Sequence, residues 1–145
     1  MTPVSWRGSF LNFATRNLFL VILFALYFPF LFFGYGSDND TYGVLDAGKA
    51  FFKTWTYQPS RNPGYLFHET AVYVLNAIGG SILTNGVSLV MGLLSAGCFS
   101  SLCRHYDIPG NRILGLTLGI HPLVWINSTS THDFVWALGF ILAGF

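Results

Sequence analysis

The chain has 145 residues, of which 52% are apolar, 18% aromatic and only 9% charged, and its formal net charge is +1. Soluble domains carry about a quarter charged residues, so this composition indicates a membrane protein and argues against a nucleic-acid-binding protein, which needs a basic face. The sequence also lacks the cysteine and histidine spacing of a structural zinc site and the motif of a nucleophile elbow.

The first apolar run covers residues 18–36 and follows Arg7 and Arg16. It is long enough to cross a hydrocarbon core about 30 Å thick. A signal peptide also begins with basic residues, but its apolar core is only about 7 to 15 residues long and ends at a small-residue cleavage site. Here the run ends in aromatic residues and Pro29, so we expect an uncleaved first transmembrane helix.

The longest polar stretch, residues 37–80, is predicted to form a large loop outside the membrane that contains two amphipathic helices. In the first of them, Val44, Phe51 and Trp55 recur at helical spacing. We expect this helix to lie on the membrane surface with its aromatic side chains in the interface. The second amphipathic piece covers residues 66–78 and is predicted to break at the Gly-Gly pair that follows.

Three further apolar segments follow the loop. Residues 82–103, 113–127 and 134–145 are predicted to be transmembrane helices, and the last of these stops unfinished. The expected fold is therefore all-α and multi-pass, with residues 1–145 forming a single membrane domain. Because the fourth helix is truncated, we expect the chain to be the N-terminal part of a longer protein.

Loop charges predict the orientation of the chain. Arg7 and Arg16 precede the first helix, and Arg104 and Arg112 flank the turn between the second and third helices. Positively charged loops tend to face the cytoplasm. The N-terminus is therefore predicted to be cytoplasmic, and the loop of residues 37–80 extracytoplasmic.

Three acids, Asp38, Asp40 and Asp46, follow the first predicted helix closely. Such residues can simply cap helices or face solvent. Asp40, however, introduces an amphipathic helix on the same predicted side as the pair His68-Glu69 and as Asp133, which heads the fourth helix. Charged groups that converge at a membrane boundary indicate a functional site.

This order of features resembles the membrane glycosyltransferases with the GT-C fold, which include protein O-mannosyltransferases, aminoarabinose transferases of lipid A and oligosaccharyltransferase catalytic subunits. The strings "SDNDTYGVLDAG" and "TYQPSRNPGYLFHE" and the Asp at the head of the fourth helix carry the resemblance. It implies an enzyme of the bacterial inner membrane that moves a sugar from a polyprenyl-phosphate donor to an unidentified lipid, glycan or protein. The fragment alone is expected to be inactive, because the resemblance covers only the N-terminal part of such enzymes.

By position, the resemblance implies that Asp40 is the catalytic carboxylate, with Asp38 as the alternative. Sugar transfer from a lipid phosphate needs a general base and a positive charge against the leaving phosphate. The predicted substrate-binding residues are Arg61, Lys53, Tyr65 and Asp133, and the predicted metal-binding residues are Glu69 and His68. Arg61 has a simpler alternative role, in which it only reaches lipid headgroups. In metal-dependent members of the family, the acid at the head of the fourth helix belongs to a cluster of carboxylates. The "NSTSTHD" turn contains no acidic pair, so the resemblance leaves open whether a divalent metal ion is the cofactor.

A second function class is a non-enzymatic membrane protein, such as a transporter or flippase component for lipid-linked sugars, in which the loop gates access. Transporters typically place their binding sites near the middle of the bilayer. The predicted transmembrane segments carry almost no ionisable residues. That distribution favours a site at the membrane surface over a path through the bilayer, with membrane lipids and the lipid-linked donor as partners.

Overall fold

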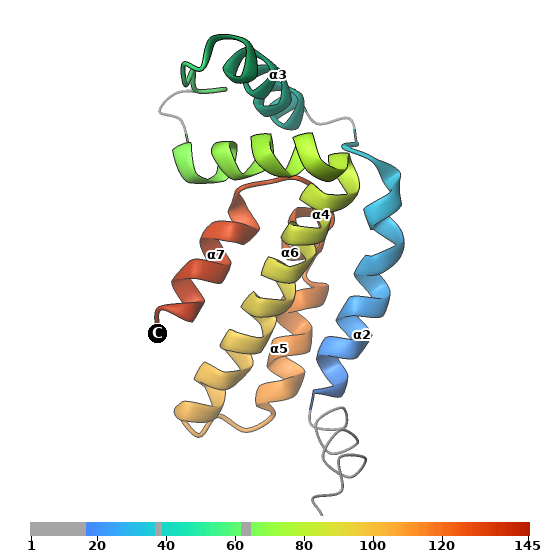
Figure 1. Ribbon diagram of the computed structural model, residues 1–145. Coiled ribbons are helices and arrows are strands. Elements are labelled where there is room, and N and C mark those ends of the chain that lie inside the picture. Colours follow the sequence, from blue (N-terminus) through green and yellow to red (C-terminus); the bar gives the residue numbers. More distant parts are fainter. Residues whose placement is uncertain (1–16, 37–38, 62–64) are drawn as a thin grey trace, which may run out of the picture.

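A computed structural model describes residues 17–36, 39–61 and 65–145 (Figure 1). These residues form helices and turns, without any strand, so the predicted all-α fold class is confirmed for the described part of the chain. The elements are α2 (Leu18–Tyr27), the 3₁₀ helix η1 (Phe28–Phe33), α3 (Asn39–Thr54), α4 (Leu66–His105), α5 (Asn111–Ile120), α6 (Pro122–Ser128) and α7 (Phe134–Ala143).

Helix α4 consists of two arms that meet at a sharp kink. Gly79 and Gly80 have non-helical backbone angles, and the φ of Gly80 is 58°, a value that glycine adopts without steric cost. The predicted break at this pair is therefore confirmed. The first arm, residues 66–78, runs across one end of the molecule, whereas the second arm, residues 81–105, runs along its length (Figure 1).

The second arm of α4 forms the centre of a helical bundle with α2, α5, α6 and α7 (Figure 1). Apolar side chains of α2, η1 and α4 form one core cluster: Phe19, Leu23, Tyr27, Leu31, Leu89 and Ala96. The buried hydroxyl of Tyr27 donates a hydrogen bond to the carbonyl oxygen of Gly119 at 2.7 Å, so this polar group has a partner within the core. Burial of this apolar surface provides most of the driving force for packing the helices together.

Prolines modify two of the predicted transmembrane segments. The first segment changes from α-helix to 3₁₀ helix next to Pro29, where a backbone N–H is missing. The third segment is divided into α5 and α6 at His121, whose ψ of 128° is extended, as is typical of a residue before proline. The last segment is helical over Phe134–Ala143. Three of the four predicted segments thus exist as shorter or interrupted helices, whereas residues 82–103 lie wholly within the second arm of α4.

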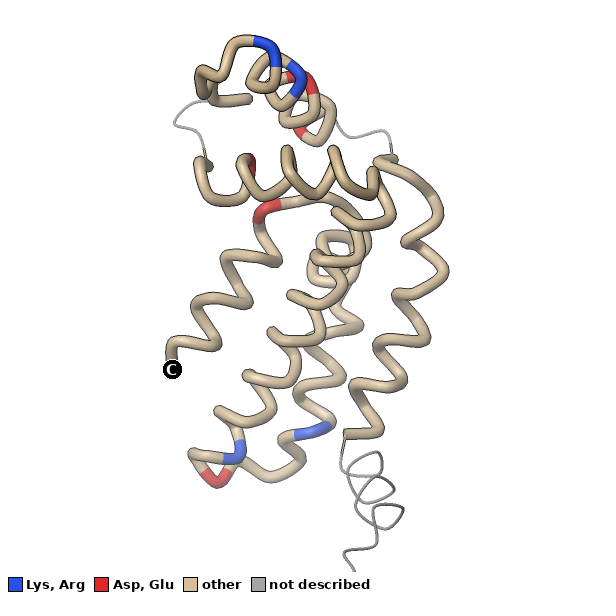
Figure 2. The backbone as a smooth tube through the Cα atoms, viewed as in Figure 1, with Lys and Arg blue, Asp and Glu red and all other residues tan. Residues whose placement is uncertain are grey.

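Charged side chains gather at the two ends of the bundle (Figure 2). None of the residues in 17–36, 70–103, 113–132 and 134–145 is Asp, Glu, Lys or Arg. One helix among the described residues, Leu66–His105, is long and apolar enough to cross a membrane, while Leu18–Phe33 and Phe134–Ala143 are shorter apolar helices.

The apolar face of α3, which the sequence predicts to face the membrane, is at least partly covered by protein. It packs against the first arm of α4, where Val44 and Leu45 form a buried cluster with Val72 and Tyr73. This part of the face is therefore not free to contact lipid. Some aromatic side chains are nevertheless exposed. Tyr42 and Phe52 on α3 are 48% and 43% exposed, and Trp55 directly after it is 76% exposed.

Candidate functional site

Arg61 connects two carboxylates that are far apart in the sequence. Its Nη1 donates to Oδ2 of Asp40, and its Nη2 donates to Oδ1 of Asp133 at 2.8 Å. The side chain of Asp133 is only 12% exposed, whereas that of Asp40 is 57% exposed. The structure thus brings together three of the predicted site residues, and Asp40 is the one that faces water.

Three different elements position this ion-pair cluster. Asp40 lies in the first turn of α3, Arg61 follows α3 in a loop, and Asp133 is the N-cap residue of α7. The Asp133 side chain makes no capping hydrogen bond to its own helix. Its carboxylate is therefore directed to Arg61, and the cluster links the loop after α3 to the start of α7.

A buried polar network holds the turn before α7 in place. The hydroxyl of Thr131 is 2.8 Å from Oδ1 of Asn85 and 3.0 Å from the hydroxyl of Thr84. Nδ2 of Asn85 donates in turn to the carbonyl oxygen of Gly34 at 2.7 Å. Because buried polar groups with satisfied hydrogen bonds restrict a core to one arrangement, this network positions Asp133 relative to α4 and to the end of η1.

Glu69, on the first arm of α4, is fully buried beside the cluster. Its carboxylate accepts hydrogen bonds from the hydroxyls of Tyr57 at 2.7 Å, Ser60 at 2.6 Å and Tyr73 at 3.4 Å. The backbone N–H of Ser60 also donates to it, at 3.3 Å. Glu69 therefore holds the loop of residues 55–61 against α4.

The pKa values of this group follow from its hydrogen bonds. Burial acts to raise the pKa of Glu69, but the hydrogen bonds from Ser60 and Tyr57 outweigh it, and the pKa is lowered. Burial, together with the hydrogen bond to Glu69 and its charge, raises the pKa of Tyr57 to about 12. At neutral pH, Glu69 is therefore an anion and Tyr57 a neutral donor.

His68 is 7% exposed, and its imidazole ring meets the ring of Trp136 edge to face at a centroid distance of 5.1 Å. Burial lowers its pKa, more than the neighbouring carboxylates Asp133 and Glu69 raise it. Within the described part of the chain, Nε2 of His68 has no hydrogen-bond partner. His68 is thus a neutral, buried side chain at the inner edge of the cluster.

A cavity of about 10 Å³ lies between the ion-pair cluster, His68 and Glu69. Such a volume holds about one water molecule, so substrates can reach only the outer, exposed side of Asp40. The residues that the structure describes contain no group of three or more His, Cys, Asp or Glu side chains arranged to hold a metal ion. The predicted metal-binding role of His68 and Glu69 stays a prediction, and the Glu69 oxygens are already hydrogen-bonded.

The remaining predicted site residues differ in their position. Tyr65 lies next to the cluster, with its ring 4.7 Å from Cζ of Arg61 in a cation–π contact. Lys53 lies in the last turn of α3, about 20 Å along the helix axis from Asp40 at the α-helical rise of about 1.5 Å per residue. The structure therefore does not bring Lys53 to the cluster. Asp38 lies outside the described residues.

Sequence reasoning missed the residues that support the site. Tyr57 and Ser60 bond to Glu69, and Thr131 and Asn85 anchor the turn before Asp133. For Tyr57 and Ser60, the only sequence signal is their position in the polar loop that precedes Glu69, a carboxylate on a mostly apolar helix that needs hydrogen-bond donors if it is buried. For Asn85, the signal is an amide in a predicted transmembrane helix, where polar residues are costly unless they have a partner.

We predict that Arg61→Gln loosens the loop of residues 55–61, because the substitution removes both ion pairs and leaves the carboxylate of Asp133 without its partner. In hydrogen exchange, the amides of this loop should exchange about tenfold faster, as expected for the loss of charged hydrogen bonds.

The matched control for this experiment is Lys49→Gln. It removes the Lys49–Asp46 pair, whose side chains are 70% and 74% exposed, and such surface pairs contribute little to stability. Equal effects of the two variants would contradict a linking role for Arg61.

Comparison of the chain with protein-family models, with curated proteins and with solved structures finds no match in any of the three. The site is therefore interpreted from its own geometry.

Proposed function

We propose that the chain forms the N-terminal part of a multi-pass membrane glycosyltransferase that moves a sugar from a polyprenyl-phosphate donor to an acceptor outside the cytoplasm. The observation that supports this proposal best is the position of Arg61 between Asp40 and Asp133. These residues combine a carboxylate that faces water with a guanidinium group at one end of an apolar bundle.

The multi-pass arrangement is supported by the distribution of charge and apolar surface. The second arm of α4 is about 37 Å long at the α-helical rise of about 1.5 Å per residue, enough to cross a bilayer. Outward-facing side chains on the other helices are apolar as well, among them Phe24, Ile113 and Phe140. In a membrane these side chains would contact lipid, with the ion-pair cluster at the water boundary.

In the proposed reaction, Asp40 is the general base that takes a proton from the acceptor hydroxyl or amine as the acceptor attacks the sugar. Arg61 stabilises the negative charge on the phosphate that leaves. A guanidinium group has five N–H donors, and the bonds to Asp40 and Asp133 use two of them. The other donors can bind a phosphate. If the phosphate also displaces Asp40 from Arg61, Asp40 becomes available as the base. Breaking this ion pair costs little free energy, because Asp40 is mostly exposed.

We predict that Asp40→Asn lowers sugar transfer by about a hundredfold, since an amide cannot act as the base. The assay uses the product of the complete reading frame in membrane vesicles, with a labelled sugar on polyprenyl phosphate, and measures the label on the acceptor. Asp46→Asn is the matched control, because it changes an exposed carboxylate on the same helix. Transfer at a normal rate by the Asp40→Asn protein would sink the proposal.

The alternative is a non-enzymatic component for the movement of lipid-linked sugars. It is favoured by the internal pairing of the cluster, in which the carboxylates and Arg61 satisfy one another and leave a cavity of only about 10 Å³. If this alternative holds, vesicles that contain the wild-type protein should show movement of lipid-linked sugar from one leaflet to the other, but no transfer of the sugar to an acceptor.

A further inference from the structure

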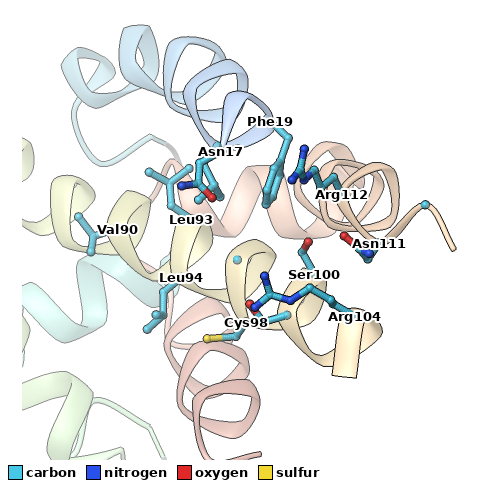
Figure 3. A pocket seen from close by; sticks show the side chains of 14 residues that line it. Asn17, Phe19, Val90, Leu93, Leu94, Cys98, Ser100, Arg104, Asn111 and Arg112 are labelled. Atoms are coloured by element: carbon cyan, nitrogen blue, oxygen red, sulfur yellow. The ribbon is translucent and has the colours of Figure 1, made fainter. Parts of the chain in front are cut away.

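A groove of about 800 Å³ (Figure 3) lies at the end of the bundle where α2 begins and α4 is followed by α5, opposite the end that carries α3 and the start of α7 (Figure 1). The start of α2, the C-terminal part of α4 and the start of α5 form its sides. We call it the basal groove. Its size is that of a typical binding site for a small molecule, and it shares no residue with the ion-pair cluster.

One part of the basal groove is apolar. Leu93 and Leu94 of α4 form a wall together with Leu20 of α2, and Val90 continues this wall along α4. Leu94 and Val90 are 39% and 59% exposed. In water such exposed side chains would be unfavourable, whereas a hydrocarbon chain would cover them.

The other part of the groove is basic. Arg104 and Arg112 are exposed and line it, and none of the described residues that line it is Asp or Glu. In Figure 3 the guanidinium groups of Arg112 and Arg104 lie above and below Ser100, and Val90 and Leu94 lie to the left of them. The ion pairs found among the described residues all involve Lys49 or Arg61, so neither Arg104 nor Arg112 is neutralised by one of them.

We infer that the basal groove binds one anionic phospholipid, with its phosphate on Arg104 and Arg112 and an acyl chain along Leu93 and Leu94. Two guanidinium groups match a phosphate in charge and in hydrogen-bond geometry. The apolar wall matches a hydrocarbon chain, and the two parts adjoin as headgroup and chain do. Basic pockets between helices at the cytoplasmic side of a membrane bind anionic headgroups in this way.

This inference goes beyond the proposed transfer reaction, because it concerns the other end of the molecule and needs no sugar donor. The test measures retention of phosphatidylglycerol by the full chain in detergent, using native mass spectrometry. We expect one phosphatidylglycerol to be retained in preference to phosphatidylcholine. The double substitution Arg104→Gln and Arg112→Gln should weaken this retention about tenfold, as for the loss of charged contacts.

The matched control is Lys49→Gln combined with Lys53→Gln, which removes the same charge from the other end of the molecule. It should leave retention unchanged. An equal loss in both double variants would overturn the inference, because it would indicate general attraction by net charge. A protein dimer that forms in place of the lipid complex would also overturn it and assign the groove to a second copy of the chain.

Two further measurements locate the lipid. Cys98 lines the groove and is partly exposed, whereas Cys103 is buried, so phosphatidylglycerol should slow alkylation of Cys98 severalfold without affecting Cys103. Leu94→Trp should reduce retention without a change of charge, because the larger side chain fills the apolar part. Alkylation of Cys98 at the same rate with and without phosphatidylglycerol would place the lipid elsewhere and contradict the inference.

Discussion

Replacement of Glu69 with alanine is expected to lower the free energy of unfolding by about 4 kcal/mol, because removing one partner of a buried charged network leaves the others unsatisfied. Glu69 is fully buried and accepts hydrogen bonds from Tyr57, Ser60 and Tyr73. In the variant, these donors face a cavity, and the loop of residues 55–61 loses its attachment to α4. Chemical unfolding in detergent micelles, followed by circular dichroism, measures the difference.

Glu69→Gln is the matched control, because it keeps the shape of the side chain and one acceptor oxygen but removes the charge and the second acceptor. We expect it to cost about half as much as the alanine substitution. An alanine variant as stable as the wild type would contradict the structural role of this carboxylate.

The same residue predicts how stability depends on pH. Although burial opposes ionisation, the hydrogen bonds from Ser60 and Tyr57 lower the pKa of Glu69 from its ordinary value of 4.5. A carboxyl group whose pKa is lower in the folded protein stabilises the fold above its unfolded pKa. It loses this contribution as the pH falls through the folded value. The wild type should therefore lose stability below about pH 4.5, and Glu69→Gln should remove this part of the pH dependence.

A second large effect is expected from Gly92→Ala, which should destabilise the bundle by about 3 kcal/mol, the upper part of the usual range for overpacking. A Cβ atom at Gly92 would lie 2.1 Å from Oγ and 2.6 Å from Cβ of Ser128. Ser128 is fully buried, and its hydroxyl donates to the carbonyl oxygen of Val124 at 2.6 Å. Helix α6 would therefore have to move away from α4, and unfolding measurements would detect the loss of packing.

Gly86→Ala is the matched control on the same helix. A Cβ atom at Gly86 would meet nothing within 4 Å, and alanine is favoured over glycine in helices by up to about 1 kcal/mol. The control should therefore be neutral or stabilising. Similar unfolding free energies for the two variants would contradict the close contact between α4 and α6.

Local properties of the sequence were enough to predict the helices. Apolar runs without charge predicted the positions of α2, the second arm of α4, α5 with α6, and α7, and the Gly-Gly pair predicted the kink. The sequence also predicted that Asp40 and Asp133 lie on the same side of the membrane, and the structure brings them to the same arginine. These predictions depend on composition, periodicity and backbone preferences over short stretches of chain, so they require no knowledge of packing.

Only the tertiary structure decided which side chains meet. Arg61 and Asp133 are 72 residues apart, and no local pattern indicates that Arg61 bonds to Asp133 and Asp40. The buried state of Glu69 and the contact of α3 with α4 likewise depend on how separate helices pack. An amphipathic pattern shows which face of a helix is covered, and for α3 the sequence alone determined that face. Protein and lipid can both cover apolar side chains, so only the fold decided that the apolar face of α3 packs against α4.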